Sequence, residues 1–145
     1  MTFTKEYGIK KTLVARLLPG EDILESLEAL VMQYDVQGGQ INFIGAIGQA
    51  VLGYFDRHES QYKHFTINEG LEVTSGMGNV SRLEDGTPVV HAHMVVGDEK
   101  GKSYSGHLMK GCTVSVTIEI VMQIFDVQLT RSKDEATGLN LLNLQ

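Results

Sequence analysis

Several residue types are scarce in this chain of 145 residues, and each scarcity narrows what the protein can be. The single cysteine, Cys112, cannot form an internal disulfide, and it excludes within one chain the zinc sites that need two or more cysteines. No apolar run approaches the roughly eighteen residues of a membrane-spanning helix. No apolar stretch follows a basic N-terminal region, as it would in a secretory signal. We therefore expect a cytoplasmic protein that has no membrane partner.

Basic residues are in the minority. Twelve Lys and Arg against eighteen Asp and Glu give a net charge of −6 with histidine neutral. This balance opposes a general polyanion binder, because contacts to phosphates need clustered Lys and Arg. Proline is rare, with two residues, whereas sixteen glycines favour tight turns and closely packed backbone in a sheet-rich protein. The length suits one compact domain, which we assign to residues 1–145, with a core from about residue 9 to residue 128.

One segment has the spacing of an amphipathic helix, from Glu21 to Tyr34. Its apolar residues form a single stripe on one face of such a helix: Ile23, Leu24, Leu27, Leu30, Val31 and Tyr34. We expect Gly20 to be the N-cap, and the glycine pair at residues 38–39 to end the helix.

Most of the remaining chain is typical of β-strands, with β-branched residues and apolar alternation between turn residues. The predicted strands are residues 11–18, 40–46, 49–56, 62–67, 71–75, 89–96, 103–108 and 113–128. Together these segments predict an α+β fold, a mainly antiparallel sheet with one principal helix packed on it. Residues 132–145 are polar and then leucine-rich, and we expect them to form a loosely held tail.

Three of the five histidines fall in one predicted hairpin. His91 and His93 are two residues apart on a strand, so their side chains leave the same face. A five-residue loop at residues 97–101 would place His107 opposite His91, and Ser105 opposite His93. In that register the three imidazoles share one face and could converge on a common point.

Three neutral imidazoles on one face are a ligand set for zinc, or for nickel, copper or ferrous iron. The fourth ligand could be water, a substrate atom or a carboxylate. Glu119 is the first carboxylate to test, because its parity differs from that of the apolar residues on either side. His58 and His64 lack such company and are predicted to be surface residues, and Cys112 is predicted to be a buried, inert thiol.

Six short sequence elements lie within the stretch from about residue 9 to residue 128. They are Arg16-Leu17-Leu18-Pro19-Gly20-Glu21-Asp22-Ile23, Ile44-Gly45-Ala46-Ile47-Gly48, Gly76-Met77-Gly78-Asn79-Val80-Ser81, His91-Ala92-His93-Met94-Val95-Val96-Gly97-Asp98, Gly106-His107-Leu108 and Thr117-Ile118-Glu119. In order and spacing the chain resembles the PPC domain family (plants and prokaryotes conserved domain, DUF296), in its stand-alone prokaryotic form.

The resemblance implies a mainly antiparallel sheet with short flanking helices, and assembly as a homotrimer. It also implies that the positions of His91, His93 and His107 hold a metal ion, with zinc as the expected ion. Plant members of this family carry an AT-hook that binds the minor groove of DNA. The present chain has no Arg-Gly-Arg-Pro core of that kind, so the plant DNA-binding element is missing.

Three function classes therefore stay open at this point. The first is a homotrimeric zinc-binding domain. The second is a metal-dependent hydrolase-type enzyme, in which zinc-bound water is the nucleophile and Glu119 is the base or a fourth ligand. The third is a DNA-binding regulator by family analogy, which the net charge of −6 opposes.

Overall fold

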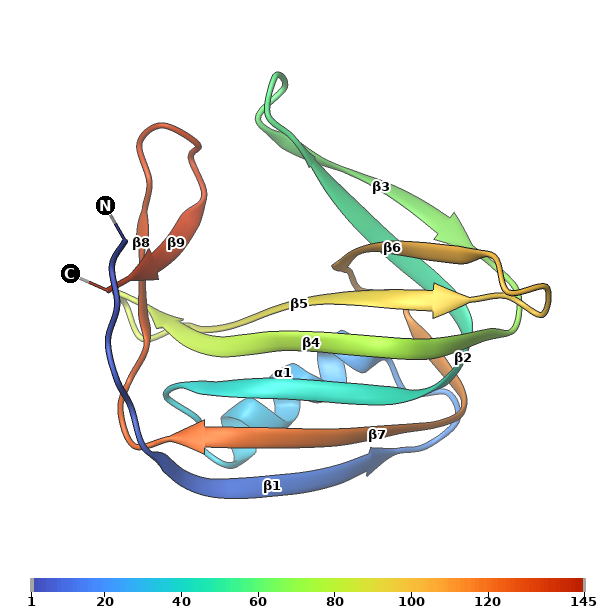
Figure 1. The fold of residues 1–145 in the computed structure, drawn as a ribbon, viewed down its shortest axis with the longest axis horizontal. Coiled ribbons are helices and arrows are strands. Elements are labelled where there is room, and N and C mark those ends of the chain that lie inside the picture. The colour runs from blue at the N-terminus through green and yellow to red at the C-terminus, as the bar shows by residue number, and fades with distance from the viewer. Residues whose placement is uncertain (1, 145) are drawn as a thin grey trace.

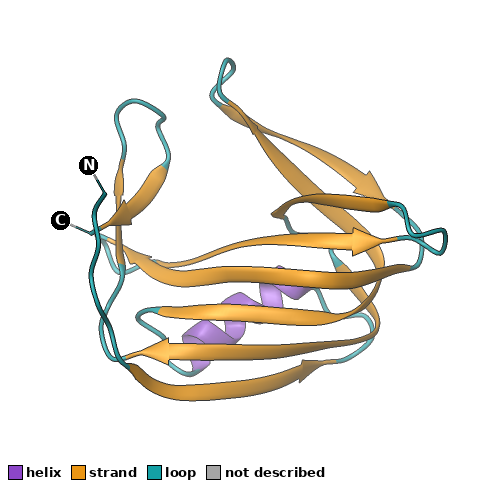
Figure 2. Cartoon of the chain, viewed as in Figure 1, coloured by secondary structure: helices purple, strands orange, loops and turns teal. Residues whose placement is uncertain are grey.

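The structure is a computed structural model that describes residues 2–144. Its elements follow one another along the chain as β1 Ile9–Leu17, α1 Ile23–Gln33, β2 Gly39–Asp56, β3 Gln61–Ile67, β4 Leu71–Leu83, β5 Pro88–Gly97, β6 Ser103–Leu108, β7 Thr113–Phe125, β8 Thr130–Lys133 and β9 Asn140–Asn143. The strands form one sheet, and α1 lies behind β4, β2 and β7 in the view of Figure 1. The predicted α+β class, a mainly antiparallel sheet with one principal helix, is confirmed (Figure 2). Within residues 2–144, the short flanking helices implied by the resemblance are not found.

The strand order is β1-β7-β2-β6-β5-β4-β8-β9, and β3 pairs with the second half of β2. Strand β2 pairs with β4 along its first half and with β6 near its end, so β2, β6, β5 and β4 close a ring of hydrogen-bonded strands. The β2–β3 and β8–β9 hairpins project from the same side of the sheet (Figure 1).

The helix prediction is confirmed, with different ends. Asp22 is the N-cap, and its side chain accepts a hydrogen bond from the Glu25 amide at 3.0 Å. The prediction of Gly20 as N-cap is wrong, because the short carboxylate of Asp22 can satisfy an amide of the first turn and glycine has no such group. Ile23, Leu27 and Val31 of the predicted stripe are fully buried against the sheet.

The two strands predicted at residues 40–46 and 49–56 are one continuous strand, β2. The strand bends where its register shifts, between Phe43 and Gly45 against β4 and again after Ala46 against β7. Gly45 has a φ of +145°, and a Cβ at this position would overlap the carbonyl oxygen of Thr117 on β7. Glycine therefore allows both the backbone conformation and the close approach of β7.

Replacing Gly45 by alanine is expected to lower the free energy of unfolding by about 2 kcal/mol or more, because the new methyl group meets backbone that cannot easily move. Urea denaturation of both proteins measures the difference. The matched control is Gly70→Ala, since Gly70 has open space around its Cβ position. An equal stability for the Gly45→Ala and Gly70→Ala variants would contradict the packing described here.

The prediction of a loosely held tail at residues 132–145 is wrong for the described part of it. Strands β8 and β9 form a hairpin, and β8 pairs in parallel with the end of β4 through Arg82 and Thr130. This hairpin buries Arg131, which is 6% exposed. The C-terminal segment is therefore part of the sheet and brings a charged side chain inside it.

The sheet face opposite α1 carries exposed apolar side chains. Val14 and Val121 are cross-strand partners, and both are exposed. We call the following set the open apolar face: Val14, Ile44, Met77, Val95 and Val121. Exposed apolar side chains gathered on one face commonly mark an interaction site. In residues 2–144 no helix has both the length and the apolar character needed to cross a membrane.

Candidate metal centre

The three predicted histidines come together on β5 and β6. Ala92 and Met94 point into the core, so His91 and His93, which alternate with them on β5, point to the other face. The predicted register is wrong, because His107 lies opposite His93 and not opposite His91. Gly97 already pairs with Ser103, so the hairpin loop is residues 98–102. This shifts the pairing by two residues, and a two-residue shift keeps each side chain on its face.

The cluster has the dimensions of a metal site. One ring nitrogen from each of His91, His93 and His107 lies within 4.8 Å of the other two. The Nε2 atoms of His91 and His93 are 3.2 Å apart. In a tetrahedral zinc site with Zn–N bonds of about 2.05 Å, two ligand nitrogens are roughly 3.3 Å apart. The spacing of these two nitrogens therefore fits a shared zinc ion.

The protonation of the cluster also fits a metal. Burial lowers the pKa of His91 to about 4, with further lowering by the charges of Arg131, His107 and His93. Burial and the neighbouring His93 lower the pKa of His107 as well. Both imidazoles are therefore neutral at pH 7, which is the form that binds metals. Within residues 2–144, the buried Nδ1 of His107 has no hydrogen-bond partner. A buried polar atom without a partner costs free energy, and a bound metal or ligand that contacts this nitrogen would remove that cost.

These pKa shifts predict that the metal-free protein loses stability in mild acid. The unfolded imidazole takes up a proton near pH 6.5, but folded His91 does so only near pH 4. Stability should therefore fall as the pH drops from 6.5 toward 4, by up to about 2 kcal/mol between pH 7.5 and pH 5. Urea denaturation of metal-free protein at these two pH values measures the fall. A His91→Gln variant should lose most of this pH-dependent fall in stability. An unchanged pH dependence in that variant would contradict the attribution of the fall to His91.

Two pockets border the histidines. One, with a volume of about 530 Å³, is lined by His93 and His107 together with Tyr62 and other aromatic side chains. The second, of about 210 Å³, is lined by His91, His107, Tyr62 and Arg131. The ring of Tyr62, on β3, packs on the ring of His107 with centroids 4.8 Å apart. Within the described chain, neither pocket is lined by an Asp or a Glu.

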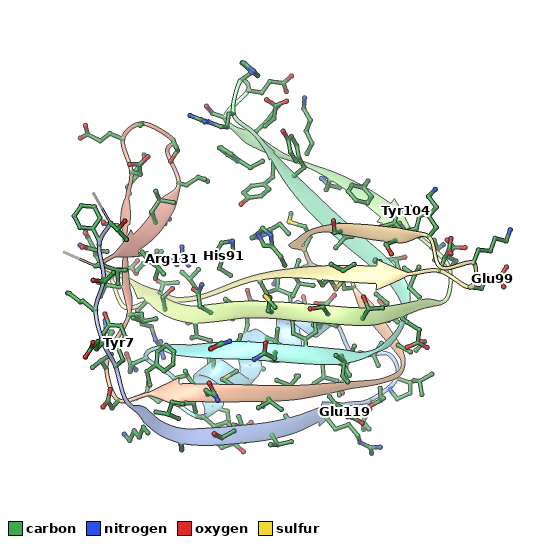
Figure 3. All side chains as sticks on the ribbon, viewed as in Figure 1. Tyr7, His91, Glu99, Tyr104, Glu119 and Arg131 are labelled. Atoms are coloured by element: carbon green, nitrogen blue, oxygen red, sulfur yellow. The ribbon has the colours of Figure 1, made fainter. Side chains whose placement is uncertain are left out.

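Glu119 lies outside this site, so its prediction as a fourth ligand or as a base is wrong within one chain. It is exposed on β7, where its cross-strand partner on β2 is Ile44. Strands β2 and β4 lie between β7 and β5, and strand spacings of about 4.8 Å place Glu119 roughly 14 Å from β5 along the sheet. Figure 3 shows Glu119 and His91 far apart. The alternation of side chains along a strand predicted the correct face of the sheet for Glu119. It does not show how many strands separate Glu119 from the histidines.

Arg131 is the residue of the site that sequence reasoning missed. Its guanidinium lies next to His91, as Figure 3 shows, with Nη2 3.4 Å from the imidazole Nδ1. An isolated arginine in a polar segment usually indicates exposed surface. The signal for its burial is the parallel pairing of β8 with β4, which is not visible in the local pattern.

The predicted exposure of His58 and His64 and the predicted burial of Cys112 are confirmed. His58 and His64 are exposed and lie outside the cluster. Cys112 is fully buried, and burial raises the pKa of its thiol to about 11. The thiol donates a hydrogen bond to the carbonyl oxygen of Val51 at 3.3 Å. At neutral pH it is therefore not a thiolate, the form that acts as a nucleophile.

Comparisons with known proteins bear on this fold and this site. The chain is 33% identical over 140 residues to the bifunctional protein GlmU of Synechococcus sp. (strain JA-3-3Ab), an alignment that covers 95% of this chain and 21% of that protein. The chain thus spans about a fifth of the length of that relative.

Solved structures match over nearly the whole chain. A metal-containing protein from Archaeoglobus fulgidus has a TM-score of 0.86 and 31% identity, with 99% of each chain covered. A protein from Bacteroides thetaiotaomicron, described provisionally as DNA-binding, has a TM-score of 0.87 and 26% identity, with 95% of this chain and 97% of that chain covered. A family model, that of the Plants and Prokaryotes Conserved (PCC) domain, matches residues 4–126. The chain therefore belongs to the plants and prokaryotes conserved domain family, as its sequence elements indicated.

Proposed function

We propose that this protein is a zinc-binding domain in which His91, His93 and His107 hold the ion, and that it assembles as a homotrimer. The observation that carries the proposal is the convergence of the three imidazoles, with Nε2 atoms of His91 and His93 3.2 Å apart. The similar protein from Archaeoglobus fulgidus is described as metal-containing, which supports a metal at this site.

The chemistry of the donors favours zinc. Imidazole nitrogen suits zinc, copper, nickel and iron, and a tetrahedral site with three protein ligands suits zinc with one open position. Zinc bound in this way lowers the pKa of a water molecule in the open position toward neutrality. A hydrolase would also need a base near that water. In the described chain no Asp or Glu lines either pocket beside the histidines, so we propose binding and not hydrolysis.

The open apolar face supports the homotrimer. Val14, Ile44 and Val121 are more than 40% exposed, although residues on the other face of each of their strands pack in or against the core. Covering such a face with surface of other copies removes apolar area from water, and a closed ring of three copies does this through head-to-tail contacts between different patches. We assign this face to contacts between copies of the chain.

Charge disfavours DNA as the partner. The net charge is −6, and several basic side chains are held by acids. Lys63 pairs with Asp56, Lys110 with Glu25, and Arg82 with Asp35. Because DNA binding depends on basic groups that are available to phosphates, these pairs weaken that alternative.

The test is the zinc content of the pure protein. Metal-free protein is incubated with excess zinc, separated from free ions by gel filtration, and measured by elemental analysis. We expect one zinc ion per chain, eluting with a particle of about 48 kDa, three times the 16.0 kDa of one chain. A zinc-to-chain ratio near zero would refute the metal site, and a mass of one chain would refute the trimer.

A further inference from the structure

Among residues 2–144, Arg131 is a buried cation without an anionic partner. It is 6% exposed, and within the described chain its guanidinium donates hydrogen bonds to neutral acceptors only: Ser81 Oγ at 2.7 Å, the Asn140 carbonyl oxygen at 2.8 Å and Asn79 Oδ1 at 2.8 Å. Arg82 is buried to the same extent, but it forms an ion pair with Asp35. Buried charges are normally compensated by an opposite charge. Within residues 2–144, Arg131 therefore lacks an acidic partner of the kind that Arg82 has in Asp35.

The uncompensated charge lies at the metal site. Nη2 of Arg131 is 3.4 Å from Nδ1 of His91, which is longer than a good hydrogen bond. When Nε2 of His91 faces a metal, Nδ1 carries the proton and cannot accept one from Arg131. The guanidinium then has N–H groups to offer to another acceptor, since it has five and three are used by Ser81, Asn140 and Asn79.

The charge count shows what that acceptor must be. Three neutral imidazoles leave a bound zinc ion with a charge of about +2, and Arg131 adds one more. Among residues 2–144 no Asp or Glu lines the two pockets beside the cluster. Two neighbouring cations in a partly buried site are stable when an anion lies between them. The described part of the chain does not supply that anion at this place.

We propose that the zinc centre takes a small organic carboxylate, which binds the open position of the zinc and the guanidinium of Arg131 together. This rests on the proposed zinc site. The ligand occupies the pocket of about 210 Å³ that His91, His107 and Arg131 line. The planar fork of a guanidinium matches the two oxygens of a carboxylate. The other walls include Val89, Leu139 and Tyr62, which suit the organic part of such a ligand better than they suit inorganic phosphate.

The test uses the full chain loaded with cobalt(II), whose visible absorption bands report changes in its ligands. Titration with acetate should shift these bands, and Arg131→Gln should weaken the acetate affinity about 10-fold or more while cobalt still binds. The matched control is Arg82→Gln, which removes a buried arginine away from the histidines and should leave the acetate affinity unchanged. The neutral analogue acetamide should bind far more weakly than acetate to the unaltered protein, a comparison that does not depend on the folding of any variant.

Each other outcome overturns a stated part of the proposal. Cobalt binding with no response to acetate refutes the carboxylate site and leaves the metal site standing. Equal responses to acetate and acetamide, or an unchanged acetate affinity in a folded Arg131→Gln variant, refute the role of Arg131. Tighter binding of inorganic phosphate than of acetate refutes the carboxylate class. Failure to bind cobalt refutes the proposed zinc site itself.

Discussion

Replacing His93 by alanine is expected to weaken zinc binding by more than about 100-fold, because groups that merely support a zinc ligand already contribute about 10- to 100-fold. His93 is exposed at the cluster, and its Nε2 is 3.2 Å from that of His91. Its removal opens no cavity in the core, so the fold should persist. Competition for zinc with a chromophoric chelator measures the affinities of the original and altered proteins.

The matched control is His64→Ala. His64 is an exposed histidine on β3 that lies outside the cluster, so its loss removes the same chemical group from a place where no metal is expected. The affinity of this variant should equal that of the original protein. If His93→Ala and His64→Ala bind zinc equally well, the three-histidine site is wrong.

The second large effect concerns assembly. Replacing Ile44 by lysine is expected to reduce the proposed homotrimer of about 48 kDa to the 16.0 kDa of one chain. Ile44 is 55% exposed on the open apolar face, and an ammonium group buried there between copies would be desolvated. The fold of the single chain should tolerate the change, because Ile44 is exposed and its loss opens no cavity in the core. Light scattering coupled to gel filtration measures the mass.

Met32→Lys is the control for this change. Met32 is 60% exposed on α1, on the opposite side of the sheet from the open apolar face, and its substitution should leave the mass unchanged. A trimer that survives Ile44→Lys would show that another surface holds the copies together. Loss of the trimer in both variants would point to a general effect of added charge.

The fold was predictable where burial repeats along the sequence. The stripe from Ile23 to Val31 indicates a helix because one face of it is buried, and the structure buries that face. The sequence does not show that β2 continues through Gly45, since a glycine can end a strand or bend it. The choice depends on the approach of the Thr117 carbonyl from a strand 72 residues later, a contact between distant segments.

The site was predictable to the extent that it is local. His91, His93 and His107 share a face by strand alternation alone, so an error of two residues in the register left the cluster intact. Glu119 also had the correct face but stands on the wrong strand, because strand order depends on distant pairings. Arg131 reaches the site through the pairing of β8 with β4, and no turn or residue spacing near Arg131 indicates that pairing.

X-ray absorption at the zinc edge of the zinc-loaded protein tests the metal site most directly, because it measures the distances and types of the atoms around the ion. We expect a first shell of nitrogen or oxygen at about 2.0–2.1 Å, with the outer-shell scattering of three imidazole rings. His93→Ala should lower the imidazole contribution in whatever zinc remains bound. A sulfur shell at about 2.3 Å, or an oxygen shell without imidazole scattering, would contradict a zinc ion held by His91, His93 and His107.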